Sequence, residues 1–150
     1  MKHIYLSLLT ILFAFSLSAE PWVDWSVGDE VTELTIMDVQ SNYTDTYLTN
    51  LKTTLIRDLQ IRKDLGLILD YAVWVAHWLD HPNVYITTVF ANAEAAAPNQ
   101  ANDELVAQEW ENRYSGEDEE AIQQLGFNYE EIRTVADHTY LRRVTFHDVE

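Results

Sequence analysis

Two closely spaced histidines are the residues in this sequence that best fit a chemical role. His77 and His81 are four residues apart, so their side chains share a face in a strand and also meet on a helix. Together with a carboxylate such as Asp38 or Glu94, two imidazoles would suit zinc or iron. The chain has no His-Glu-x-x-His motif, and a partly solvated histidine pair at a strand end explains the same pattern. We favour that interpretation and predict neither a metal nor a cofactor.

An arginine pair and a group of aromatic residues are the other candidates. Arg142 and Arg143 stand side by side in a chain with only 9 basic residues against 25 acidic ones. One of them would be able to hold an anionic substrate in a cleft, although ion pairs with surface acids are the simpler interpretation. Aromatic side chains such as Tyr71 and Trp74 would line a pocket for an apolar ligand, although such residues are more often core. The candidate pocket residues are Asp38, Tyr71, Trp74, His77, His81, Arg142 and His147.

Signatures of the common catalytic classes are missing from the sequence. There is no cysteine, which excludes cysteine nucleophiles and disulfides, and the 4 glycines form no phosphate-binding loop or Gly-x-Ser-x-Gly elbow. A net charge of −16 argues against binding to nucleic acid and to anionic membranes. The catalytic residues therefore stay unknown, and whether the protein is an enzyme stays open.

Residues 1–19 predict a secretory signal peptide. Lys2 gives a positive start, residues 4–17 form an apolar run, and Ser18 and Ala19 are small residues suited to cleavage. The run is shorter than the ~20 residues that span a membrane. The mature chain is therefore expected to be a soluble periplasmic or secreted protein without membrane association, and loss of Lys2 makes its net charge about −17.

The mature chain predicts an arm followed by one domain. Residues 20–30 form a short acidic arm that docks Trp22 and Trp25 on the domain, or else a lid over a pocket. Residues 31–150 have a length that suits a single domain.

The domain starts with a predicted strand and a predicted helix. Residues 31–40 favour a strand, and either Asn42 or Thr44 would be the N-cap of the helix that follows. Gly66 suits the left-handed position that ends such a helix. One apolar stripe at helical spacing consists of Leu48, Leu51, Leu55 and Leu59.

Two further strands follow the helix. Residues 67–79 are almost continuously apolar, and residues 84–90 are rich in β-branched side chains. We expect an antiparallel pair joined near residues 80–83, where proline and asparagine interrupt the pattern. Because residues 67–79 show no polar alternation, both faces of this strand are expected to be covered.

The second half predicts several short helices before a last strand. We expect a helical turn and loop over 91–102, followed by a helix over 104–114. A second helix is expected from its cap Ser115 to Gly126, and Asn128 opens a further helix whose residues Ile132, Val135 and Ala136 point inward. The last strand is expected over 139–149.

This order is βαββαβ, and it resembles the dimeric α+β barrel superfamily, which includes antibiotic-biosynthesis-type monooxygenases and stress-response barrels. The resemblance rests on residues 31–40, on 43–48 with the leucine helix, on 63–66 and on the strand pair. It implies a ferredoxin-like α+β fold with a four-stranded antiparallel sheet, an extra helix before the last strand, and pairing of two copies into a barrel. It also implies a ligand site between sheet and helices. The segment 115–138 is longer than a minimal member requires.

Three functions are compatible with the sequence. The first is an exported homodimeric barrel that binds a small apolar or aromatic ligand in the cleft between sheet and helices. The second, implied by the resemblance, is a cofactor-independent monooxygenase or related enzyme with Asp38, Tyr71, Trp74 and His77 as pocket groups. The third is an acidic interaction protein that docks a basic partner.

Overall fold

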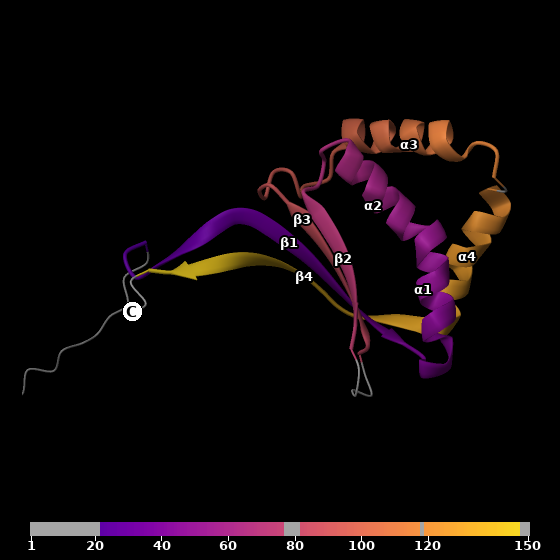
Figure 1. Cartoon of the computed structure of the whole chain (residues 1–150), viewed down its shortest axis with the longest axis horizontal. Coiled ribbons are helices and arrows are strands. Elements are labelled where there is room, and N and C mark those ends of the chain that lie inside the picture. The colour runs from indigo at the N-terminus through magenta and orange to yellow at the C-terminus, as the bar shows by residue number, and fades with distance from the viewer. Residues whose placement is uncertain (1–21, 77–81, 118, 148–150) are drawn as a thin grey trace, which may run out of the picture.

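The computed structural model describes residues 22–76, 82–117 and 119–147. The elements, in chain order, are β1 (Trp25–Val39), the 3-10 helix η1 (Ser41–Tyr43), α1 (Thr44–Thr53), α2 (Leu55–Asp64), β2 (Asp70–Val75), β3 (Val84–Phe90), α3 (Gln100–Tyr114), α4 (Glu119–Ile132) and β4 (Arg133–Phe146) (Figure 1). The order is thus βαββαβ, with each helical segment divided in two. No helix in the described part of the chain is long and apolar enough to cross a membrane.

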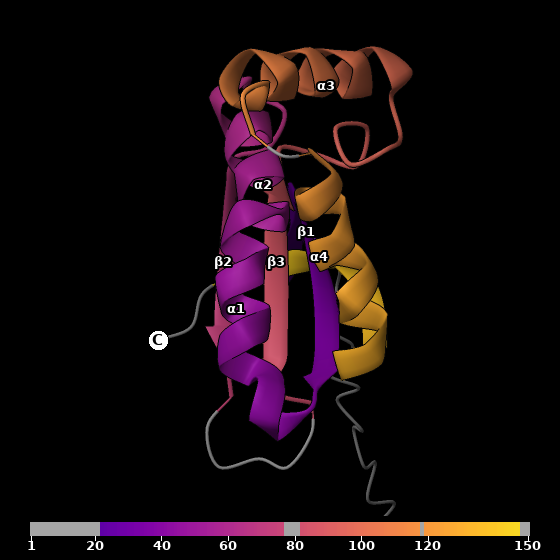
Figure 2. The same cartoon turned by 90° about the vertical axis from the view of Figure 1, so that its right-hand side faces the viewer.

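The four strands form one antiparallel sheet in the order β2-β3-β1-β4. This is the ferredoxin-like α+β fold predicted from the sequence, including the extra helix before the last strand. Figure 2 shows α1 and α2 lying over β2 and β3, α4 beside them near β1, and α3 crossing the end of α2. Helices α1, α2 and α4 therefore cover one side of the sheet, the helix-facing side, and we call the other the reverse side.

The core lies between the helix-facing side of the sheet and the helices. Alternate residues of β1 and β3 supply one wall, and the predicted leucine stripe contributes to the other, with Leu51 and Leu59 both buried. Full burial of one such aliphatic side chain contributes on the order of 1.5–3 kcal/mol. The main buried cluster consists of Met37, Val39, Tyr47, Leu51, Val84, Ile86 and Tyr129.

The predicted long helix is divided at Thr54. Its backbone leaves the helical region (φ −106°, ψ −97°), and its hydroxyl donates to the Asn50 carbonyl at 3.1 Å. The same hydroxyl lies 2.8 Å from the hydroxyl of Tyr129 on α4. A threonine that bonds to the preceding turn bends a helix, and here a second helix also holds the threonine in place.

The predicted end of this helical segment is confirmed, but its predicted start is wrong. Gly66 has φ +72°, the left-handed conformation that glycine adopts without steric cost. At the start, neither Asn42 nor Thr44 is the N-cap; Tyr43 occupies that position without a side-chain hydrogen bond. The hydroxyl of Thr44 instead donates to the carbonyl of Ser41 at 3.4 Å.

The boundary between α4 and β4 differs from the prediction. Helix α4 continues through Gly126, where a helix end was expected, and β4 begins at Arg133. Val135 and Ala136, predicted to face inward on a helix, therefore belong to the strand, and Val135 is 59% exposed. The register with β1 shifts between Ile36 and Met37 at this point. Long-range pairing with a central strand has overridden the local helical pattern.

Helix α3 starts earlier than predicted and ends where another helix was expected to begin. The side chain of Asn99 caps it by accepting from the backbone N–H groups of Ala101 and Asn102. Ser115, predicted as an N-cap, is the C-cap of α3, and its N–H donates to the Glu111 carbonyl at 3.0 Å.

Strands β1 and β4 continue beyond the body of the domain as a two-stranded ribbon (Figure 1). Trp25 pairs with Phe146 and Val27 with Val144, so much of the segment predicted as an arm is part of β1. Trp22 is 68% exposed, and its ring lies 6.5 Å from that of Trp25.

Strand β2 is shorter than predicted. It spans Asp70–Val75 within the expected strand 67–79, and residues 77–81 lie outside the described part. Its antiparallel pairing with β3 is confirmed, and the N–H of Ala76 donates to the carbonyl of Asn83 at 2.8 Å where the two strands meet.

Asn83 joins the start of β3 to the end of β1, and its loss should be costly. Its Oδ1 accepts from the N–H of Val39 at 3.0 Å, and its Nδ2 donates to the carbonyl of Val39 at 2.8 Å. We predict that Asn83→Ala lowers the free energy of unfolding by about 2–4 kcal/mol, because two buried backbone groups lose their partner.

Urea denaturation measures this change. The control is Asn92→Ala, which removes one exposed hydrogen bond to the N–H of Ala95 and should cost less than about 1 kcal/mol. Equal losses in the two variants would contradict the role assigned to Asn83.

Candidate functional site

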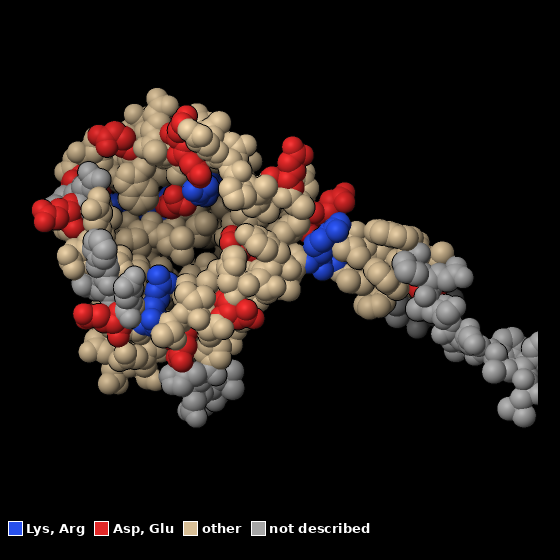
Figure 3. Space-filling model, turned by 180° about the vertical axis from the view of Figure 1, so that it is seen from behind, with Lys and Arg blue, Asp and Glu red and all other residues tan. Residues whose placement is uncertain are grey.

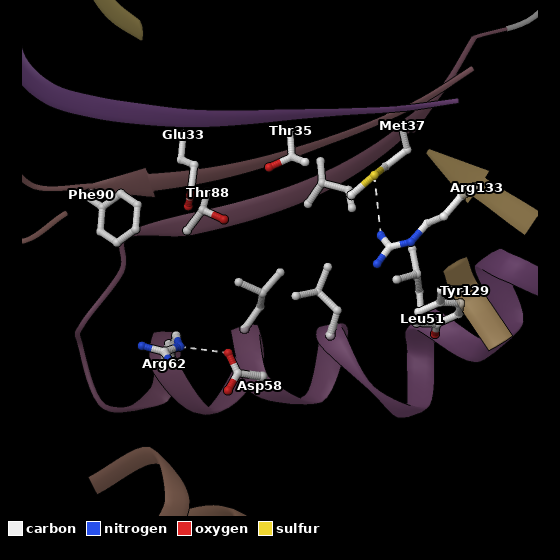
Figure 4. A pocket seen from close by; sticks show the side chains of 13 residues that line it. Glu33, Thr35, Met37, Leu51, Asp58, Arg62, Thr88, Phe90, Tyr129 and Arg133 are labelled. Atoms are coloured by element: carbon white, nitrogen blue, oxygen red, sulfur yellow. Dashed lines mark hydrogen bonds and ion pairs between the residues drawn. The ribbon is translucent and has the colours of Figure 1, made fainter. Parts of the chain in front are cut away.

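A cavity of about 420 Å³ opens between the helix-facing side of the sheet and the helices. We call it the cleft. Figure 3 shows a hollow lined mainly by uncharged residues, with Lys or Arg side chains at two sides. The cleft is lined by Glu33, Thr35, Met37, Leu51, Leu55, Asp58, Leu59, Arg62, Ile86, Thr88, Phe90, Tyr129 and Arg133 (Figure 4).

The cleft exists because the sheet places short side chains opposite the leucine stripe. Alternation along β1 brings Thr35 to the same side as Met37, and the register pairs Glu33 with Thr88 of β3. Thr35 and Thr88 are smaller than their neighbours Met37 and Ile86, and they leave space on this side of the sheet. The opposite wall is the leucine stripe of α1 and α2, so the cavity is mainly apolar.

Two ion pairs occupy one end of the cleft. Arg62 donates to Asp58 one turn earlier on α2 at 2.7 Å and to Asp103 of α3 at 3.2 Å. Burial disfavours the guanidinium, but the hydrogen bonds and charges of the two carboxylates outweigh it and raise the pKa of Arg62. Figure 4 shows Asp58 and Arg62 on the helical wall, away from Arg133. One guanidinium meets two carboxylates here, so the chain itself fully compensates the positive charge at this end.

The carboxylate of Glu33 also has partners from the chain. Its Oε1 lies 2.7 Å from Nε2 of His138 and 3.4 Å from the hydroxyl of Tyr140, both on β4. Burial, followed by the charge of Glu33, raises the pKa of Tyr140, so its hydroxyl stays a neutral donor.

Arg133 occupies the other end of the cleft among aromatic rings. Its Nη1 donates to the hydroxyl of Tyr47 at 2.9 Å and lies 3.4 Å from the sulfur of Met37. Its Cζ is 4.9 Å from the ring centre of Tyr129 and 5.4 Å from that of Tyr47, and these rings meet edge to face. Cation–π contacts therefore fix the guanidinium without neutralising its charge.

Of the residues predicted from the sequence as a pocket, those that the structure describes are not among the residues that line the cleft. Tyr71 is on the helix-facing side of β2, where its hydroxyl donates to Gln60 at 2.8 Å, whereas Trp74 and Asp38 are on the reverse side by strand alternation. His77 and His81 lie outside the described residues.

The predicted residues of the last strand lie elsewhere. Arg142 lines a separate cavity of about 410 Å³, donates to the Gly28 carbonyl at 2.9 Å and lies 3.8 Å from Asp29. His147 is at the end of the ribbon, 3.1 Å from the hydroxyl of Ser26. Among the described residues, no three His, Asp or Glu side chains gather as metal ligands do. With His77 and His81 undescribed, the metal hypothesis is untested.

Sequence reasoning missed the residues that give the cleft its character. Arg133 was hidden because the segment around it had the periodicity of a helix, although its place on the helix-facing side follows once it is paired with Val39. Thr35 and Thr88 carried a weak signal, since short polar residues on a buried side of a sheet indicate space.

Comparisons with known proteins are limited to the fold. No protein-family model matches the sequence, and no curated protein is similar to it. A dimeric ferredoxin-like protein from an uncultured marine organism has a TM-score of 0.48 at 15% identity, covering 81% of this chain and 92% of that one. A candidate antibiotic biosynthesis monooxygenase from Chloroflexus aurantiacus has a TM-score of 0.42 at 15% identity, covering 81% and 99%.

The cofactor-independent oxygenase SnoaB from Streptomyces nogalater has a TM-score of 0.38 at 10% identity, covering 82% of this chain and 97% of that one. The ferredoxin-like fold that the sequence predicted is shown by the chain's own strand order, β2-β3-β1-β4, and the likeness to these proteins is one of structure only.

The tyrosine beneath Arg133 should make stability depend on pH. Burial raises the pKa of Tyr47, although Arg133 partly lowers it. A folded-state pKa above the unfolded one favours the folded state at lower pH, so the free energy of unfolding should fall as the pH rises above about 10. Tyr47→Phe should make this fall shallower. Burial also raises the pKa of Tyr129, so Tyr129 accounts for part of the pH dependence that remains in the variant.

Urea denaturation between about pH 8 and about pH 11 measures the slope. Tyr43→Phe is the control, because this tyrosine is 44% exposed on η1. If Tyr47→Phe and Tyr43→Phe had the same slope, the buried phenol would not be its source.

Proposed function

We propose that this protein binds a small, mainly apolar molecule in the cleft and works as a homodimer. The observation that carries the first part is the open cavity of about 420 Å³ whose lining includes six leucine, isoleucine, methionine and phenylalanine side chains. Ligand sites are typically concave, mostly apolar cavities of about 300–1,000 Å³ with a few polar groups that orient the ligand. The cleft fits this description in volume, in lining and in the position of its charged groups at its ends.

The energetic argument favours an apolar occupant. Each Å² of apolar surface removed from water contributes about 25 cal/mol, and an apolar molecule in the cleft would cover Leu55, Leu59 and Phe90 as well as itself. The rest of the core is closely packed, with Tyr47 and Val39 fully buried. An open apolar space beside such a core indicates a binding function rather than loose packing.

The homodimer proposal rests on the reverse side of the sheet. The described helices lie on the helix-facing side, so apolar residues of the reverse side face solvent; Trp74 is 60% exposed and Leu141 is 47% exposed. An apolar patch of this kind marks an interaction surface, and a twofold axis lets it cover itself. By strand alternation the patch comprises Leu34, Ile36, Ala72, Trp74, Tyr85, Val89 and Leu141.

Export of the protein is part of the same proposal. Its support is the charge and hydropathy pattern of residues 1–19 together with the small residues Ser18 and Ala19. The ligand would then be bound in the periplasm or outside the cell.

The monooxygenase alternative gains no support from the described geometry. Of the groups it requires, Tyr71 lies on the helix-facing side of the sheet, whereas Asp38 and Trp74 lie on the reverse side. The sheet separates them, so they do not surround one substrate. The acidic-partner alternative rests on net charge alone.

Filling the cleft should weaken binding without unfolding the protein. Thr35→Leu places a larger apolar side chain in the cavity, and we expect it to weaken binding of naphthol, a neutral aromatic probe, by about ten-fold or more. Isothermal titration calorimetry measures the dissociation constant.

Thr32→Leu makes the same substitution on the reverse side of the same strand and is the control. It should keep the affinity of the unaltered protein. Equal affinity for naphthol in both variants, or no binding by the unaltered protein, would contradict binding in the cleft.

A charge on the reverse side should separate the dimer. We predict a dimer at micromolar concentration by light scattering and a monomer for Leu141→Glu, because an unpaired carboxylate would be buried in the interface. Leu105→Glu on α3 is the control, since Leu105 has the same 47% exposure as Leu141 but lies away from the sheet.

A monomeric unaltered protein, or dissociation by both variants, would count against this interface. Native mass spectrometry of protein from its own cells gives the subunit number independently. The subunit mass in the same spectrum shows whether residues 1–19 have been removed.

A further inference from the structure

Of the four charged residues that line the cleft, three lie within ion-pair distance of a partner in the chain. Asp58 and Arg62 neutralise each other, and Arg62 also pairs with Asp103. Glu33 lies 2.7 Å from His138. The fourth charged residue of the lining is Arg133, and among the described residues no carboxylate lies within ion-pair distance of it.

The contacts of Arg133 hold it in place but leave its charge uncompensated. The hydroxyl of Tyr47 and the sulfur of Met37 both meet Nη1, and both are neutral groups. Burial keeps the pKa of Tyr47 raised, so no phenolate forms there near neutral pH. A half-buried cation beside an apolar cavity is costly unless an anion joins it.

The geometry also leaves Arg133 able to bind a ligand. A guanidinium has five N–H donors in a planar fork, and the hydrogen bonds among described residues use Nη1 alone. Figure 4 shows the side chain extending from β4 toward Met37 at the sheet side of the cleft. Contacts with the rings of Tyr47 and Tyr129 hold the guanidinium in place, so little side-chain entropy is lost when an anion binds.

We infer that the ligand of the cleft is a small carboxylic acid with an apolar body, whose carboxylate pairs with Arg133. This inference rests on the proposed function, since it names the chemical class that the same cleft takes. The apolar body lies along the leucine stripe, and the carboxylate meets those N–H groups of the guanidinium that make no hydrogen bond to a described residue. A doubly charged phosphate fits less well, because the lining offers one uncompensated cation and also holds the carboxylates of Glu33 and Asp58.

Calorimetric titration with matched acids and alcohols tests this inference. The probes are octanoate against octanol and naphthoate against naphthol, which differ chiefly in the acidic group. The unaltered protein should bind each acid about ten-fold or more tightly than its alcohol, the ratio expected for a charge-assisted hydrogen bond. Arg133→Gln should remove this preference and keep the affinity for the alcohol, while Arg133→Lys should retain part of the preference.

Arg142→Gln is the matched control. Arg142 is the arginine for which the sequence suggested a role in holding an anion, but it lines the separate cavity beside Asp29. This variant should bind both acids as the unaltered protein does. Loss of the preference in Arg142→Gln and not in Arg133→Gln would overturn the assignment.

The remaining outcomes separate this inference from the proposed function. If the unaltered protein binds acid and alcohol equally, the cleft binds apolar molecules but Arg133 does not select an acid. If it binds none of the four probes, both the proposed function and this inference fail. If Arg133→Gln does not fold, two other results would overturn the inference. One is that Arg133→Lys prefers the acid as strongly as the unaltered protein does. The other is that the affinity for the acid does not change with salt concentration.

Discussion

The long antiparallel pairing of β1 with β4 is the constraint on which the rest of the structure depends. It runs from Val39 opposite Arg133 to Trp25 opposite Phe146, with two shifts of register. Because β1 lies between β3 and β4, it fixes the position of both outer halves of the sheet. The same ladder decides where α4 ends, brings Arg133 to the helix-facing side and extends the ribbon beyond the domain.

The cleft follows from a local conflict between two demands on the helix-facing side. The core requires large side chains, and Met37, Ile86 and the leucine stripe meet that demand. The neighbouring Thr35 and Thr88 are shorter and leave space opposite the leucine stripe. Thr54 adds to the effect, because the bend it makes with Tyr129 sets the direction of α2 over this part of the sheet.

The sequence predicts the features that depend on local chemistry. The spacing of leucines indicated the helix, Gly66 indicated its end, and β-branched residues indicated the strand pair, which together give the correct fold. What it could not show depends on distant partners. The break at Thr54 depends on the hydrogen bond to Tyr129 of a distant helix. The start of β4 depends on pairing with β1, so the helical pattern around Val135 was misleading. The cleft residues were missed for the same reason, because Arg133 was placed on a helix.

The net charge of the chain limits what an acidic ligand of this protein can be. With a formal charge of −16, the protein repels anions at long range, and this repulsion decays over a Debye length of about 8 Å at physiological ionic strength. Attraction must therefore come from contact, and Arg133 supplies the one positive charge of the lining that no described carboxylate pairs with. One contact of this kind orients a ligand but leaves most of the affinity to burial of apolar surface. A singly charged molecule with a large apolar body satisfies both conditions, whereas a highly charged metabolite satisfies neither.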